Sequence, residues 1–159
     1  MPAVPAIIEA AARVPALCGT KEGHNDLNRW QALHAGTDLT VLPADDFNWI
    51  EYYRRGSKGF MTPTIAVYPE AALELHRLLE NKSYTEAERY ESAFKQLWRA
   101  VIGHPELAEY HLVARFKAVC KAAGTFDPGH AGPPIFDLPV ARLDLIRSVL
   151  ADVAKQIKS

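Results

Sequence analysis

The sequence predicts an α/β fold in which parallel strands alternate with helices and a layer of helices follows. Three short segments with strand character, 16–20, 38–42 and 58–62, recur at a spacing of about twenty residues, with a helical pattern between them. Such alternation favours parallel strands joined by right-handed crossovers. After residue 68 only helical patterns follow, so we expect every strand to lie in the first half of the chain.

The first strand lies between two helices. The spacing of apolar residues over 5–14 predicts a short helix, which a proline ends. The strand 16–20 is expected to be buried and to carry Lys21 at its end. A second helix is expected to be capped by Asp26 and to end at Gly36.

The other two strands have similar surroundings. The strand 38–42 is closed by a proline, and Asp45 or Asp46 can cap the next helix, 47–55. The third strand, 58–62, is again followed by a proline. A parallel sheet of only three strands would leave its edges unpaired, which single domains usually avoid.

The second half predicts helices separated by breaks. Pro69 opens one helix, and Thr85 with Glu88 forms a capping-box pair at the start of a long helix that ends at Gly103. A further helix is expected over 106–123, and the Gly- and Pro-rich residues that follow predict an ordered loop. The last helix carries an apolar stripe that is typical of packing core. Its members are Leu143, Ile146, Leu150, Val153 and Ile157.

The composition argues against several classes of protein. Hydrophobic residues make up 48% of the chain and charged residues 23%, as in a globular protein. A formal net charge of -1 argues against nucleic-acid or membrane-surface binding, and no apolar stretch reaches transmembrane length. We therefore expect a cytoplasmic protein, with Cys18 and Cys120 as reduced core residues. The six histidines lack metal-site spacing, so no metal is expected.

Lys21 is the residue whose position suggests chemistry most directly. Ligand sites in folds of this kind gather beyond the carboxyl ends of parallel strands, where Lys21 would lie. A neutral lysine amine in a desolvated site attacks a ketone to form a Schiff base. The alternative is an ordinary solvated lysine at a strand end. His24, three residues further on, is interpreted as a surface loop histidine.

Three motifs resemble the dihydrodipicolinate synthase/N-acetylneuraminate lyase family in their order and spacing. They are Gly19-Thr20-Lys21-Glu22-Gly23, Val41-Leu42-Pro43-Ala44-Asp45-Asp46 and Gly59-Phe60-Met61-Thr62. Pro69, the segment 114–124 and Pro134 are similar to later parts of the family, so the resemblance covers nearly the whole chain but only the family's C-terminal half. It implies a partial TIM barrel: the last three strands with their helices over 1–82, followed by a C-terminal helical bundle over 83–159.

The same resemblance implies the chemistry of a class I aldolase or lyase. Lys21 matches the family's lysine that forms a Schiff base with pyruvate or another 2-oxo acid, so it is the expected catalytic residue and no cofactor is expected. Phe60 and Met61, on the last strand, are the expected substrate-binding residues. Asp45 and Asp46 match paired acidic residues, which we interpret mainly as a helix cap and a turn.

The family's carboxylate-binding loop and catalytic tyrosine lie on strands that have no counterpart in this sequence. We therefore expect either a truncated lyase or a half-barrel that hides its sheet edges, as a homo-oligomer or against a complementing N-terminal half. Gly132 stands where many pyruvate-condensing members have an arginine, which argues against a specific role in dihydrodipicolinate synthesis. The alternative function is a non-catalytic interaction or regulatory subunit that docks a partner chain.

Overall fold

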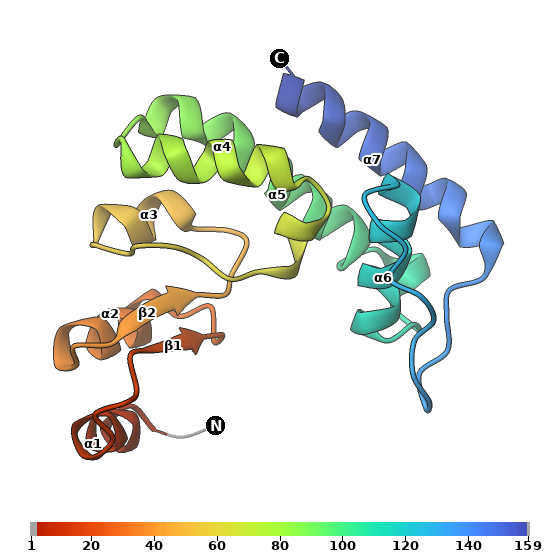
Figure 1. The fold of residues 1–159 in the computed structure, drawn as a ribbon. Coiled ribbons are helices and arrows are strands. Elements are labelled where there is room, and N and C mark those ends of the chain that lie inside the picture. Colours follow the sequence, from red (N-terminus) through yellow and green to blue (C-terminus); the bar gives the residue numbers. More distant parts are fainter. Residues whose placement is uncertain (1–2, 159) are drawn as a thin grey trace.

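The computed structural model describes residues 3–158, which contain seven α-helices, three 3-10 helices and one two-stranded parallel sheet. The first half contains α1 (Val4–Arg13), β1 (Gly19–Glu22), α2 (Leu27–Gly36), β2 (Thr40–Pro43) and α3 (Trp49–Arg54). The second half contains the helices α4 (Pro69–Glu80), α5 (Tyr84–Val101), α6 (Leu112–Ala123) and α7 (Leu143–Lys158), and the 3-10 helices η1 (Pro63–Ala66), η2 (Pro105–Leu107) and η3 (Val140–Arg142). Figure 1 shows the sheet with α1 and α2 at one end of the molecule and α6 with α7 at the other.

The helix α2 packs against the sheet where the sequence pattern places it. Asp26 accepts hydrogen bonds from the backbone N–H groups of Asn28 (2.9 Å) and Arg29 (3.1 Å), so the expected cap is confirmed. Trp30, fully buried, donates from its indole nitrogen to the carbonyl oxygen of Val41 in β2 at 2.9 Å. This bond fixes α2 against β2.

The sheet has two strands where three were expected. β1 and β2 pair in parallel, with Gly19 opposite Thr40 and Lys21 opposite Leu42. The segment 58–62 runs beside β2 but forms a single backbone hydrogen bond with it in the described chain, from the N–H group of Met61 to the carbonyl of Pro43 (2.9 Å). One hydrogen bond does not make the segment 58–62 a strand of the sheet, because paired strands form hydrogen bonds repeatedly along both backbones.

The first strand also differs from its expected position and burial. β1 starts at Gly19 instead of residue 16, and Lys21 lies within it. Lys21 and Cys18 are exposed, so the expectations of a buried strand and of a core Cys18 are wrong, whereas Cys120 is buried as expected. The reason is that β1 has a neighbouring strand on one side only within the described residues.

Two helix starts in the second half differ from the sequence prediction. The long helix α5 begins at Tyr84 after Ser83, which makes no side-chain cap, so the expected capping box of Thr85 and Glu88 is wrong. The turn after α4 explains the earlier start of α5. In this turn the N–H group of Ser83 bonds to the carbonyl of Leu78 (2.9 Å), which places Ser83 directly before the first helical residue.

The helix expected over 106–123 is split into η2 and α6. His111 caps α6 by accepting from the N–H group of Val113 at 3.2 Å. Arg115 donates to the backbone carbonyl of Tyr110 (2.8 Å), which an unbroken helix would have used internally, and to that of Ile102 after α5. Tertiary contacts that leave no local sequence pattern thus maintain the break.

The buried side chains form two clusters. The larger cluster draws on α3, α4, α5, α6 and α7, with Trp49, Leu75, Phe94 and Ile146 at its centre. The expected apolar stripe of α7 is confirmed as core, because its members pack in or against this cluster. The smaller cluster lies between α2, β2 and α3. It consists of Trp30, Leu33, Leu39, Val41 and Tyr52.

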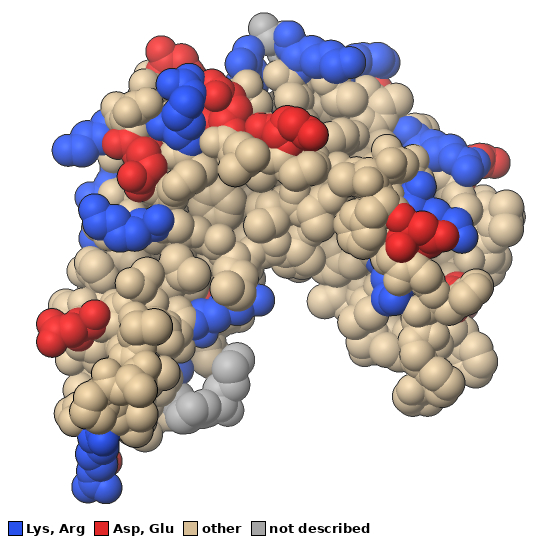
Figure 2. Space-filling view, viewed as in Figure 1, with Lys and Arg blue, Asp and Glu red and all other residues tan. Residues whose placement is uncertain are grey.

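Charged side chains lie mainly on the outer surfaces of the molecule. In the view of Figure 2 the chain is hollowed between its two ends, and basic side chains appear on both walls among mostly tan residues. None of the helices between residues 3 and 158 combines the length and hydropathy of a membrane-spanning helix.

Candidate active site

Lys21 lies on the face of the sheet that α2 does not cover. Val41 points toward α2 and packs with Trp30, so the next residue, Leu42, points to the opposite face. Lys21 is the parallel partner of Leu42 and shares that face. A cavity of about 320 Å³ opens there. It is lined by Cys18, Gly19, Thr20, Lys21, Thr40, Leu42 and Met61.

Of the two residues expected to bind substrate, the structure brings Met61 to Lys21 and turns Phe60 away. Met61 is 47% exposed and lines the same cavity as Lys21. Phe60, the preceding residue, stacks on Trp49 with ring centroids 4.8 Å apart and packs against the larger core. Successive residues of an extended segment point to opposite faces, which explains the difference.

A buried carboxylate lies at the carboxyl end of β1. Glu22 is 5% exposed and accepts hydrogen bonds from the side chain of Arg29 (2.9 Å) and from the backbone and ring of His24. Burial alone would raise the pKa of Glu22, but the bonds from His24 and Arg29 outweigh it and hold the pKa below its ordinary value. His24, interpreted from the sequence as a surface loop residue, therefore fixes the loop that follows Lys21.

Asp45 forms a turn before α3, but the expected helix cap is wrong: α3 starts at Trp49 after Asn48, and no side chain caps it. Its side chain is 2% exposed and accepts from the backbone N–H groups of Phe47 (2.9 Å) and Asn48 (3.0 Å). The same carboxylate raises the pKa of Tyr52, together with the stronger effect of burial. Asp45 thus acts as a structural residue between β2 and α3.

Asp46 has a different environment from its neighbour. It is 1% exposed, and one oxygen, Oδ1, accepts hydrogen bonds from the hydroxyl groups of Thr62 and Thr64, which also contact each other at 2.7 Å. Burial raises the pKa of Asp46 to about 6; the two threonine bonds and the charge of Lys21 lower it, and the charge of Asp45 raises it. This network joins the end of β2 to the segment that carries Met61.

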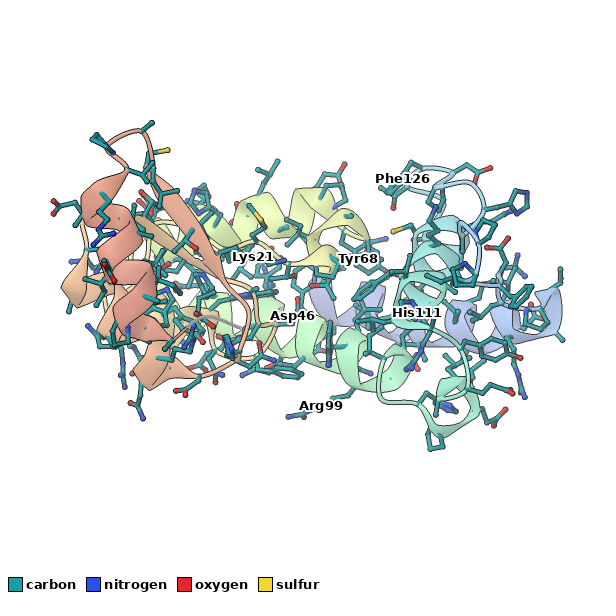
Figure 3. All side chains as sticks on the ribbon, turned by 90° about the horizontal axis from the view of Figure 1, so that it is seen from below. Lys21, Asp46, Tyr68, Arg99, His111 and Phe126 are labelled. Carbon is teal, nitrogen blue, oxygen red and sulfur yellow. The ribbon has the colours of Figure 1, made fainter. Side chains whose placement is uncertain are left out.

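Sequence reasoning identified Asp46 but not its partners. The signal that could have found them is Thr62-Pro63-Thr64, two hydroxyls spaced two residues apart at the end of a third extended segment. Parallel segments end at the same edge of a sheet, where a preceding Asp-Asp pair would meet them. Figure 3 labels Lys21 and Asp46, which lie in the same part of the molecule, away from His111 and Phe126.

The arrangement supports chemistry at an amine. The side chain of Lys21 makes no hydrogen bond or ion pair with any residue between 3 and 158, so its Nζ is accessible from the cavity. Among the same residues no group of three or more His, Cys, Asp and Glu side chains could hold a metal ion. A primary amine beside a small, mainly uncharged cavity can form a carbinolamine with a carbonyl compound and lose water to give an iminium.

Sequence comparison identifies no relative: no protein-family profile matches the chain, and no curated protein matches it. Comparison with solved structures finds the same fold. Dihydrodipicolinate synthase from Bacteroides thetaiotaomicron matches with a TM-score of 0.81 at 16% identity, over 96% of this chain and 52% of that one. A Sulfolobus solfataricus 2-keto-3-deoxygluconate aldolase variant in complex with L-2-keto, 3-deoxy-galactonate matches at 0.79 and 15%, over 95% of this chain and 50% of the aldolase.

A third solved structure has a 2-oxo acid bound. YagE, a prophage protein of the dihydrodipicolinic acid synthase family from E. coli K12 in complex with pyruvate, matches with a TM-score of 0.79 at 16% identity, over 94% of this chain and 51% of YagE. The chain therefore spans about half the length of the structures it matches.

These matches define the fold class: the chain has the fold of half of a TIM barrel, as found in known lyases and aldolases. At the level of fold they confirm the resemblance to the dihydrodipicolinate synthase family that the three sequence motifs carry.

Proposed function

We propose that Lys21 is the Schiff-base lysine of a lyase or aldolase that acts on pyruvate or a related 2-oxo acid. The observation that carries the proposal is the position of Lys21, exposed at a cavity on β1 in a fold shared with enzymes of this kind. Pyruvate is bound to YagE and a 2-keto acid to the Sulfolobus aldolase, so the substrate class is taken from those proteins.

The proposed step conserves atoms without a cofactor. The Nζ lone pair of Lys21 attacks the ketone carbon, and the carbonyl oxygen leaves as water with one proton from Nζ and one from solvent. The resulting iminium accepts the electron pair of the carbon–carbon bond that breaks and becomes an enamine, while the other fragment leaves as an aldehyde and its hydroxyl proton passes to solvent. Protonation and hydrolysis of the enamine release the 2-oxo acid and regenerate Lys21. Met61, and Phe60 if the segment 58–62 rotates, are the proposed substrate contacts. Proton transfer needs a further group, since the side chain of Lys21 has no hydrogen-bonding partner in the described chain.

A second chain or chain segment is part of the proposal. The outer edges of β1 and of the segment 58–62 have no backbone partner among the described residues. A homo-oligomer or a complementing N-terminal half would cover these edges and supply the missing walls of the site. The division into a barrel part, 1–82, and a helical part, 83–159, and the cytoplasmic location stay predictions.

Borohydride trapping tests the proposed function. The purified chain is incubated with pyruvate and reduced, and the adduct is located by intact mass and peptide mapping. We expect a reduced pyruvyl adduct on Lys21, absent from Lys21→Ala and present in Lys155→Ala, which removes an exposed lysine of α7. No adduct at Lys21 in a preparation with native circular dichroism would reject Schiff-base chemistry by this chain alone.

The unpaired sheet edges favour a second candidate function, a non-catalytic subunit that docks a partner chain. This non-catalytic subunit differs from the proposed lyase in one measurable respect: borohydride trapping with pyruvate would fail even in the assembled complex. An adduct that forms only after assembly would instead support the lyase and show that the partner completes the site.

A further inference from the structure

A second cavity, larger than the one at Lys21, lies between the segment 58–62 and α4. Its volume is about 630 Å³, within the range of sites for small organic ligands. Most of its wall is apolar, including Phe60 and Leu73, and Leu73 is 69% exposed. Two side chains in the wall carry polar groups, Lys58 and His76, and no acidic residue lines the cavity.

The hydrogen bonding of His76 determines what it presents to this cavity. Its Nδ1 lies 2.6 Å from the hydroxyl oxygen of Tyr53, which is buried. Burial and the charge of Glu80 raise the pKa of Tyr53, which keeps a hydroxyl proton at this oxygen, and we take this hydroxyl as the donor to Nδ1. With Nδ1 accepting, the ring presents an N–H group at Nε2, which has no hydrogen-bonding partner among residues 3–158.

Lys58 adds a positive charge at the same cavity. It is exposed and makes no ion pair with any described residue. A cation and an N–H donor in one apolar wall that contains no carboxylate select for an anion that also has an apolar body.

We propose that the cavity between the segment 58–62 and α4 binds a small carboxylate with an aromatic or branched apolar body. The carboxylate accepts a hydrogen bond from Nε2 of His76 and pairs with Lys58, and the apolar body packs against Phe60 and Leu73. The site is separate from the candidate active site, because Phe60 and Met61 point to opposite faces of one segment and only Leu42 lines both cavities.

The test uses two probes that differ in charge but little in shape, 4-phenylbutyrate and 4-phenyl-1-butanol. Isothermal titration and ligand-observed NMR measure their binding to the full chain. We expect 4-phenylbutyrate to bind one per chain and about tenfold more tightly than the alcohol. Equal affinities would overturn the proposal, because they would show an apolar groove without anion recognition.

Matched variants locate the probe. Lys58→Met and His76→Phe keep the length or the ring of each side chain but remove its polar group. Each should weaken 4-phenylbutyrate binding about five- to tenfold and leave 4-phenyl-1-butanol unchanged. Tyr53→Phe should weaken the acid less, because it frees the imidazole without removing it. Lys155→Met, at an exposed lysine of α7, should change neither affinity.

Two further outcomes count against the proposal. If the three variants bind 4-phenylbutyrate as the unmodified chain does, the probe lies elsewhere. If the chain is a dimer that Leu73→Lys converts to a monomer, and the dimer binds no probe, the cavity belongs to an interface between copies of this chain. Circular dichroism of each variant separates loss of the site from loss of the fold.

Discussion

Replacing Asp46 by asparagine should change how the stability of the fold depends on pH. Asparagine keeps an Oδ1 atom in the position that accepts both threonine hydroxyls, so the variant removes the charge and preserves the network. The pKa of Asp46 is raised from 3.8 to about 6, mainly by burial. A carboxyl group with a raised pKa favours folding while it is protonated, and this contribution is lost as pH rises through the folded-state pKa.

The size of the effect follows from the two pKa values. The difference between 3.8 and about 6 corresponds to roughly 3 kcal/mol of unfolding free energy lost above pH 7. About half of that loss, roughly 1.4 kcal/mol, falls between about pH 5 and pH 7.5. Asp46→Asn is neutral throughout, so we expect its stability advantage over the unmodified chain to grow by this amount across the interval.

Urea unfolding, followed by circular dichroism at several pH values, measures the difference. Groups other than Asp46 titrate in both proteins and cancel when the two free energies are subtracted. Asp144→Asn, at an exposed aspartate of α7, serves as the control, and its difference from the unmodified chain should stay constant. Two parallel stability curves for Asp46→Asn would refute the reasoning, since they would mean that the ionised carboxylate is not penalised by its burial.

Three other outcomes are expected. Lys21→Ala should abolish the trapped pyruvyl adduct without lowering the urea midpoint, because the Lys21 side chain is exposed and makes no hydrogen bond or ion pair within the described chain; a lower midpoint would reveal a structural role. Ile146→Ala should lower the unfolding free energy by about 2–5 kcal/mol, since this fully buried residue of α7 lies in the larger core; a loss below about 1 kcal/mol would contradict that packing. Gly124→Ala should cost about 1 kcal/mol and Gly124→Asn less, because φ is 72° after α6 and asparagine tolerates this region; equal losses in thermal unfolding would argue against the turn.

Local signals predicted most helices of the chain. Asp26 caps α2 because a side-chain oxygen and two nearby N–H groups suffice for the interaction, and Pro69 opens α4 because a proline needs no intrahelical donor there. The failures involve contacts between distant residues. Arg115 in α6 bonds to the carbonyl of Ile102 after α5, across the break between η2 and α6, and no pattern in a short window contains that information.

The third strand and the site show the same limit. The segment 58–62 has the composition and spacing of a strand, but strand pairing needs a partner along the whole segment, and only Met61 bonds to β2. Lys21 could be located from its motif and its strand. The contacts of Glu22 with Arg29 and of Asp46 with Thr62 required the folded arrangement of loops, although each residue is present in the motifs.

The short helix α3 is shared between the two buried clusters. Tyr52 belongs to the smaller cluster, and Trp49, Ile50 and Tyr53, on the other sides of the same helix, belong to the larger one. Separate cores tend to open as separate cooperative units with different free energies. The sheet with α1 and α2 should therefore exchange its amide hydrogens before the helices α4 to α7 do. The residues of α3 would lie at the boundary between the two units. Protection of amide hydrogens from exchange should rise there within two helical turns, from the less stable unit to the more stable one.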